Sequence, residues 1–182
     1  GGTARAVLEQ LAGSHVFGAY LDSALHFVPR GGATVAALAD DDLASGFDVA
    51  ADNALPLTLV ADLELPNRVS ISYPNMDADQ QMGEEHAERW PSRQDSVHQI
   101  RCNVGLLPSE ARGVAEAAVR DAFAARLTGT VSVPIGYAAR VPTDPVAVTD
   151  AVDGTVYRMR ITRRTDAGGV LTFDLVGDDA GD

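Results

Sequence analysis

Residues 68–73 read RVSISY, and apolar residues alternate strictly with polar ones throughout this stretch. Because successive side chains of a β-strand point to opposite faces, Val69, Ile71 and Tyr73 share one face and the polar residues share the other. This period of two predicts a half-buried antiparallel strand, with the apolar face turned toward a core.

The segment after this strand, residues 74–95, is polar and irregular in composition. A loop of that length within a domain is commonly functional or mobile. The sequence therefore predicts that 74–90 forms an exposed arm that contacts a neighbouring subunit. Trp90 is the only tryptophan of the chain and suits the role of an aromatic anchor, unless it folds back onto its own domain. The interface candidates are Tyr73, Met76, Met82 and Trp90.

The rest of the chain reads as short strands and two helices. Thr3 can cap a short helix that ends at Gly13, and the sequence SEARGVAEAAVRDAFAARLTG after Pro108 predicts a longer one that Gly129 stops. The stripe expected to be buried on the longer helix is Ala111, Val114, Ala115, Ala118, Val119, Ala122 and Phe123. The expected strands are a hairpin around Asp22-Ser23, a short strand at 33–38, strands on both sides of Pro66, a strand at 97–104, and a four-stranded meander with turns at Asp153-Gly154 and 167–169.

These elements predict an α+β fold that is mostly antiparallel β, with two helices and a small barrel-like meander. The expected organisation is a helix, hairpin and sheet segment over 1–105 with a long loop at 74–95, followed by a helix and meander over 106–182. A single compact unit is the alternative.

Composition restricts the classes of partner. The formal net charge is −12 and all 14 basic residues are arginine, so specific binding to nucleic acid or to an anionic membrane is disfavoured. No apolar run reaches the roughly 18–20 residues that a membrane span needs. Cys102 is the only cysteine, which excludes an intrachain disulfide, and it is expected to be buried. The chain begins Gly-Gly-Thr without a methionine, which suggests an excised or processed piece.

The spacing of the acidic residues after the strand at 68–73 resembles that of a calcium-binding loop. Asp77, Asp79 and Glu88 fall at loop positions one, three and twelve, but the position that requires glycine is occupied by Met82. A solvated acidic loop is the alternative, and these three acids are the metal candidates. His86 and His98 lack zinc-site spacing, and there is no nucleophile elbow or phosphate-binding loop. The sequence predicts no catalytic site and no cofactor.

Several short motifs carry a resemblance to a known family. They are the FVPRG of 27–31, the LPNRVSISY of 65–73 with the acidic and amide-rich 77–81, the stretch 109–134 that begins SEARG and ends SVP, and Pro142-Thr143-Asp144. Together they resemble the central part of phage tail hub and tip proteins, a family that includes the phage tail proteins of gene transfer agents and, more distantly, the central tail-tip proteins of lambda-like phages. The family usually has P-G-D where Thr143 stands here, and a position that favours φ > 0 suits threonine poorly.

The resemblance implies a structural, non-enzymatic part of a tail tip or baseplate hub that joins the tail tube to distal tip parts. It implies a homo-oligomer, a trimer by family, whose partners are other tail proteins (tube, distal tail and tip). It places the chain in the virion tail after production in the bacterial cytoplasm, as a piece of a longer hub protein. DNA would pass through an acidic lumen without specific binding, and this segment would insert into no membrane. The competing hypothesis is a calcium- or carbohydrate-binding β-rich module of a surface protein, and an enzyme comes third.

Overall fold

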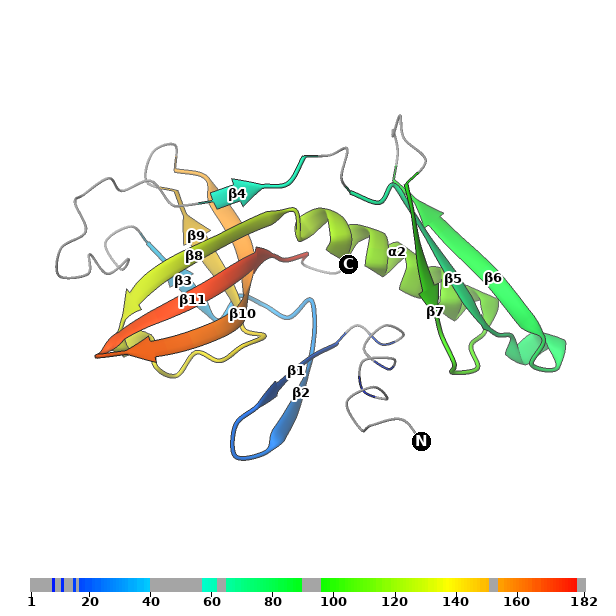
Figure 1. Ribbon diagram of the computed structural model, residues 1–182, viewed down its shortest axis with the longest axis horizontal. Helices are drawn as coiled ribbons and strands as arrows, with labels where there is room; N and C mark the ends of the chain where they lie inside the picture. Colours follow the sequence, from blue (N-terminus) through cyan, green and yellow to red (C-terminus); the bar gives the residue numbers. More distant parts are fainter. Residues whose placement is uncertain are drawn as a thin grey trace. The chain divides into compact units, whose positions relative to one another are not determined.

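The computed structural model describes residues 8, 11, 15, 17–39, 57–61, 65–89, 96–150 and 154–179. Most of this part is β-structure, with α2 as its long helix (Figure 1). The elements are β1 (Phe17–Leu21), β2 (Leu25–Pro29), β3 (Ala36–Leu38), β4 (Leu57–Leu59), β5 (Arg68–Pro74), η3 (Met76–Ala78), β6 (Met82–Glu88), β7 (Val97–Arg101), α2 (Pro108–Ala124), β8 (Leu127–Pro134), η4 (Ile135–Tyr137), β9 (Pro145–Thr149), β10 (Val156–Ala167) and β11 (Val170–Gly177). The helix predicted from Thr3 lies almost entirely outside the described residues.

The described residues group into two compact units. The first takes those of 1–17 and 61–123, and the second takes those of 18–60 and 124–182. This division differs from the boundary after residue 105 that the sequence suggested. Helix α2 groups with the strands before it because its alanine stripe packs on them, and β3 and β4 group with the C-terminal strands because they pair with β9 and β8.

The first unit contains a three-stranded sheet of order β6-β5-β7. The predicted strand is confirmed as β5, with Val69, Ile71 and Tyr73 buried in the core. It is the central strand, antiparallel to β6 and parallel to β7, so the sheet is mixed. The long loop expected at 74–95 is wrong over 82–88, because these residues form β6 and pair with β5 along its whole length.

Helix α2 covers the apolar face of this sheet. Pro108 opens the helix, and the Glu110 carboxylate accepts a hydrogen bond from the backbone N–H of Leu107 at 2.8 Å, which caps the first turn. The buried stripe is confirmed in Ala111, Ala115 and Val119, which pack in one core cluster with β5 and with the buried Cys102.

The end of α2 differs from the sequence prediction. The helix stops at Ala124, and Gly129 lies inside β8, opposite Leu175 of β11 and Leu57 of β4. Strand pairing on both sides of β8 decides the local structure here, and it overrides the helix propensity of the residues after Ala124.

The second unit contains a six-stranded sheet of order β3-β9-β10-β11-β8-β4 and the separate two-stranded sheet β1-β2. The predicted turn at 167–169 joins β10 to β11, and Gly168 and Gly169 take the positive φ that it requires. Strands β9 and β10 pair antiparallel, and Asp153 of the other predicted turn lies outside the described residues. Strand β4 pairs with β8, and the Val60 N–H donates to the Arg126 carbonyl at 2.9 Å.

The core of the second unit comes from the inward residues of the six-stranded sheet. The fully buried side chains include Leu38 of β3, Val133 of β8, Val146 of β9, Met159 of β10 and Phe173 of β11. The strands of this sheet are curved (Figure 1). The expected barrel is not closed, because β3 and β4 are the edges of the sheet and each pairs with one neighbour among the described residues.

No helix in the described ranges has the length and apolar character that crossing a membrane would require.

Candidate functional site

The turn between β5 and β6 presents apolar side chains at one end of the three-stranded sheet. The Asn75 side chain accepts a hydrogen bond from the Asp77 N–H at 2.9 Å and caps η3, and Asp79 and Gln80 then reverse the chain with positive φ. The Met76 N–H donates to the Leu106 carbonyl at 3.0 Å, which ties the turn to the segment before α2. The turn is therefore an ordered tip of a hairpin.

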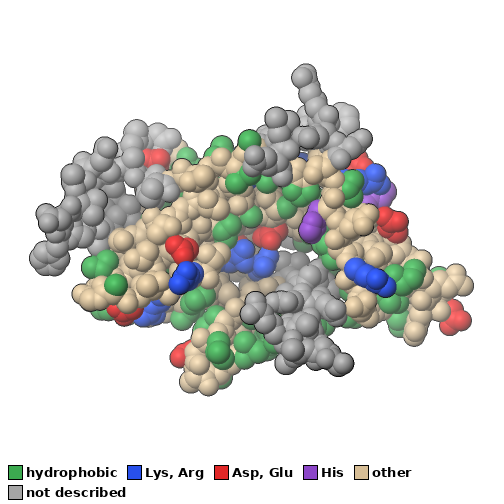
Figure 2. All heavy atoms as spheres, viewed as in Figure 1, with side chains coloured by type: hydrophobic (Ala, Val, Ile, Leu, Met, Phe, Trp, Pro, Cys, Tyr) green, Lys and Arg blue, Asp and Glu red, His purple; other side chains and the backbone are tan. Residues whose placement is uncertain are grey.

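Two of the interface candidates lie exposed on this tip. Met76 is 55% exposed and Met82 is 61% exposed, and Leu107 adds a third exposed apolar side chain from the segment before α2. Figure 2 shows apolar side chains at this end of the β5–β6 hairpin. Methionine adapts its shape to a partner, so a Met-rich exposed surface suits protein contacts.

Tyr73, the third candidate, is unavailable to a partner. Its side chain is 1% exposed in the core under α2, with its ring close to Gly83 of β6. Burial raises the pKa of its hydroxyl, and the nearby carboxylates of Glu85 and Asp77 raise it further. Two signals in the sequence conflict for Tyr73: the strand alternation predicted burial, and its aromatic ring suggested an interface. The structure agrees with the alternation. Trp90, the fourth candidate, lies outside the described residues.

The metal candidates are not brought together. Asp77 and Asp79 lie in the turn, whereas Glu88 lies at the opposite end of β6, about 20 Å along the strand. The Glu88 carboxylate is instead 3.5 Å from Nε of Arg68 on β5. The described residues contain no group of His, Cys, Asp and Glu side chains that could hold a metal ion. The three acids with calcium-loop spacing therefore do not lie on one loop, because the length of β6 separates Glu88 from Asp77 and Asp79.

The β1–β2 hairpin exposes an apolar surface that sequence reasoning missed. Leu21, Leu25 and Phe27 are all exposed on it, and Figure 2 shows apolar side chains at this hairpin. The rings of Tyr20 and His26 stack across the two strands with centroids 4.8 Å apart. The hairpin itself was predicted, and the run LHFV in β2 was a usable signal for apolar exposure on a two-stranded sheet.

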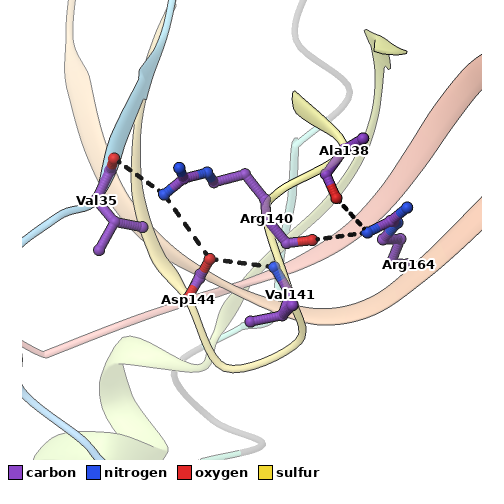
Figure 3. Close-up of polar contacts among 6 residues, drawn as sticks. All are labelled: Val35, Ala138, Arg140, Val141, Asp144 and Arg164. Atoms are coloured by element: carbon purple, nitrogen blue, oxygen red, sulfur yellow. Dashed lines mark hydrogen bonds and ion pairs between the residues drawn. The ribbon is translucent and has the colours of Figure 1, made fainter. Parts of the chain in front are cut away.

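The Pro142-Thr143-Asp144 turn is held by a network of backbone and side-chain contacts (Figure 3). The Asp144 carboxylate accepts from the Val141 N–H at 3.1 Å and lies 4.0 Å from Nη1 of Arg140. The same nitrogen of Arg140 donates to the Val35 carbonyl at 3.3 Å.

Arg164 of β10 binds this turn from the other side. Its Nη1 donates to the carbonyls of Ala138 and Arg140 at 2.6 and 3.2 Å. Thr143 takes φ of 86°, so the backbone keeps the conformation that a glycine would favour although the residue is threonine. The arrangement fixes a loop; it aligns no nucleophile with a base.

Comparisons with known proteins agree with this fold. The family model described as "Putative phage tail protein" matches residues 3–164. A chain of the virion of a native gene transfer agent (GTA) particle is similar to 97% of this chain, with a TM-score of 0.85 and 25% sequence identity.

Two crystal structures of tail proteins share the fold at lower identity. The 43 kDa tail protein of prophage MuSo2 from Shewanella oneidensis is similar to 100% of this chain (TM-score 0.60, 16% identity), and the tail protein from Neisseria meningitidis MC58 to 93% (TM-score 0.57, 14% identity). The chain spans 39% of the gene transfer agent chain and 53% of each of the other two. No curated protein sequence matches.

The family model covers most of the chain, including β5, α2 and the Pro142–Asp144 turn that carried the resemblance, and the chain therefore belongs to the phage tail protein family.

Proposed function

We propose that this chain is a structural segment of the tail tip or baseplate hub of a phage or phage-like particle, where it joins the tail tube to distal tip parts. The observation that carries the proposal is the fold shared over 97% of the chain with a component of a gene transfer agent virion. The chain would work in the virion tail after synthesis in the bacterial cytoplasm.

The role is proposed to be non-enzymatic. The polar contacts of Asp144 and Glu110 stabilise a turn and the start of a helix. Large apolar side chains are exposed at two hairpins. The hairpin tip with Met76 and Met82 and the β1–β2 hairpin with Leu21 and Phe27 are the surfaces proposed to meet other tail proteins (tube, distal tail or tip).

Self-association is part of the proposal. A hub continues the rotational symmetry of a tube, so copies of the chain would form a ring, a trimer by the family resemblance. With a net charge of −12, such a ring would let DNA pass without binding it, because like charges repel. Retention of duplex DNA by the purified chain on a filter at low salt would contradict this last point.

The location in the particle can be tested directly. The turn at Gly168-Gly169 has open space around both residues, so an epitope tag inserted there should leave β10 and β11 paired. In the bacterium that produces the particle, immunogold labelling of purified particles should place the tag at the distal end of the tail. The untagged strain is the control, and label along the tube, on the head or on no particle would contradict the hub assignment.

A further inference from the structure

The three-stranded sheet of the first unit has two edges in the described part of the chain, β6 and β7. Most side chains of both strands are exposed, including Glu84, His86 and Glu88 on β6 and Val97, Gln99 and Arg101 on β7. An edge strand offers unpaired backbone N–H and C=O groups, which another strand can pair with.

The pairing within the sheet fixes which backbone groups point outward. On the β6 side, the Arg89 N–H donates to Asn67 and the Asn75 N–H donates to Gln81, so the odd-numbered residues of β6 face β5. The even-numbered Glu84, His86 and Glu88 therefore direct their N–H and C=O groups outward.

The same reasoning applies to β7. The Cys102 N–H donates to the Ser72 carbonyl and the Ser96 carbonyl accepts from Asn67, so the even-numbered residues face β5. Val97, Gln99 and Arg101 direct their backbone groups outward. Their side chains lie on the same face of the sheet as those of Glu84, His86 and Glu88, because both sets lie beside Arg68, Ser70 and Ser72 in the pairing.

The two edges carry opposite charge. Strand β6 holds three glutamates, Glu84, Glu85 and Glu88, whereas β7 holds Arg101 and no acidic residue. Pairing of β6 with β6 of another copy would bring six carboxylates together, since each strand supplies three, and like charges across a strand pair are destabilising. Pairing of β6 with β7 brings opposite charges together.

We propose that β7 of one copy pairs antiparallel with β6 of the next copy, so that the three-stranded sheets join head to tail into a continuous sheet. The proposal rests on the proposed function, which requires self-association, and it names the contact. Strand β7 runs parallel to β5 and β6 runs antiparallel to it, so the junction is antiparallel when copies are related by rotation about an axis along the strands. A head-to-tail contact of this kind generates a ring when the rotation closes.

The charges select a register. With Arg101 opposite Glu84, Gln99 faces His86 and Val97 faces Glu88, and each of these is a pair whose backbone groups point at one another. All five residues of β7 then find partners within β6. On the other face, His98 lies diagonal to Glu85, within reach of its carboxylate.

Disulfide formation between cysteines placed on β6 and β7 tests this register. Residues 86 and 99 both neighbour Ser70, on opposite sides of β5, so they lie about 10 Å apart in one chain, beyond the reach of a disulfide. In the double variant His86→Cys/Gln99→Cys, mild oxidation should therefore join different copies and give a ladder of covalent multimers, with the 86–99 bond identified by mass spectrometry. The native Cys102 is buried and remains in every variant.

Matched variants exclude other contacts. His86→Cys alone and Gln99→Cys alone should stay uncross-linked, because each lacks its partner, and an equimolar mixture of the two should stop at a dimer. The pair His86→Cys/Glu116→Cys, which places the second thiol on the exposed side of α2, should give no ladder. Bonds joining 86 to 86 or 99 to 99, or no cross-link at all, would overturn the proposal.

A charge exchange separates this proposal from the hub assignment. Glu84→Arg and Arg101→Glu should each reduce the oligomer at least several-fold in sedimentation, and the double exchange should restore it. If the chain is labelled at the distal tail end but neither exchange alters assembly, the edge contact is overturned while the hub assignment stands. If the edge contact forms but the label is absent from the tail tip, the hub assignment fails.

Discussion

At the residue scale, Thr143 is the position where sequence and backbone conflict. It takes φ of 86°, which is unfavourable for a β-branched side chain, and its buried hydroxyl has no hydrogen-bond partner among the described residues. Its Cγ2 also lies so close to Gly18 that a Cβ there would approach to 2.6 Å. Strain of this kind persists only where the surroundings enforce it, here the Asp144, Arg140 and Arg164 contacts around the turn.

Replacing Thr143 with glycine should therefore stabilise the protein. Glycine adopts the positive φ without strain, and it removes the buried hydroxyl that has no partner. These two gains exceed the cost of losing the methyl contact and of making the unfolded chain more flexible. We expect the free energy of unfolding to rise by about 1 kcal/mol. Urea unfolding measures it. The control is Thr149→Gly in β9, which should lose about 1 kcal/mol, and an equal loss for both variants would show that the turn is not strained.

Tyr73 gives the protein a defined sensitivity to alkaline pH. Its pKa is raised in the folded state, by burial first and then by Glu85 and Asp77, so the unfolded chain ionises at lower pH than the folded one. The contribution of Tyr73 to the free energy of unfolding is fully present below about pH 10, the pKa of tyrosine in the unfolded chain. It is lost as pH rises through the higher pKa of the folded state. We expect the free energy of unfolding to fall more steeply above about pH 10, as pH rises toward the raised pKa of Tyr73, than it does in Tyr73→Phe. Equal slopes would exclude Tyr73 as the titrating group.

At the element scale, α2 depends on its first turn. The Glu110 carboxylate satisfies the Leu107 N–H, which would otherwise lack a partner at the start of the helix. Glu110→Ala should lower the free energy of unfolding by about 1 kcal/mol. Glu110→Gln should lower it by much less, because the amide oxygen can still accept the hydrogen bond from the Leu107 N–H. The comparison variant is Glu116→Ala, which removes only the exposed pair with Arg112 and should change stability by less than about 0.5 kcal/mol. Thermal unfolding, monitored by circular dichroism, ranks the stabilities of these three variants. Equal losses for Glu110→Ala and Glu116→Ala would contradict the capping role.

Elements with a strong internal pattern were predictable from sequence. The alternation in RVSISY defined β5 and its buried face, and Pro108, Glu110 and the alanine spacing defined the start and buried side of α2. In these segments the periodicity of the chain itself matches the structure that it adopts.

Elements that depend on a distant partner were missed. The sequence MGEEHAE of β6 contains one buried residue, Ala87, and becomes a strand because β5 pairs with it along its length. The parallel placement of β7 and the inclusion of Gly129 in β8 likewise follow from neighbours far along the chain. Local propensity carries little information about such pairings, and a loop was the wrong inference for β6. For the site, the exposure of Met76 and Met82 is compatible with the prediction. Tyr73 lies on the core-facing side of β5 that the alternation predicted, and this burial is what rules it out as an interface candidate.

At the scale of the whole molecule, two separate hydrophobic cores imply two separate units of stability. One core is built around Ile71, Tyr73 and Ala115, and the other around Phe173, Met159 and Val148. Phe173→Ala should remove about 3–5 kcal/mol of stability from the six-stranded sheet. Hydrogen exchange should then accelerate in β8–β11 while β5 and the middle of α2 keep their protection.

Ile71→Ala provides the reciprocal measurement. It should accelerate exchange in β5, β6 and α2 and leave β10 and β11 protected, because Ile71 belongs to the other core. If either variant accelerated exchange evenly over both units, the two cores would unfold as one cooperative body.

The bond between Val60 and Arg126 has a consequence for how such chains can diversify. The segment 61–123 departs from the end of β4 and returns at the start of β8, two adjacent strands that already touch at 2.9 Å. A short turn between Val60 and Arg126 would therefore be enough to connect β4 to β8 and keep their pairing. An insertion at this point of the sequence is thus free to change in length and sequence while the β4–β8 ladder is preserved.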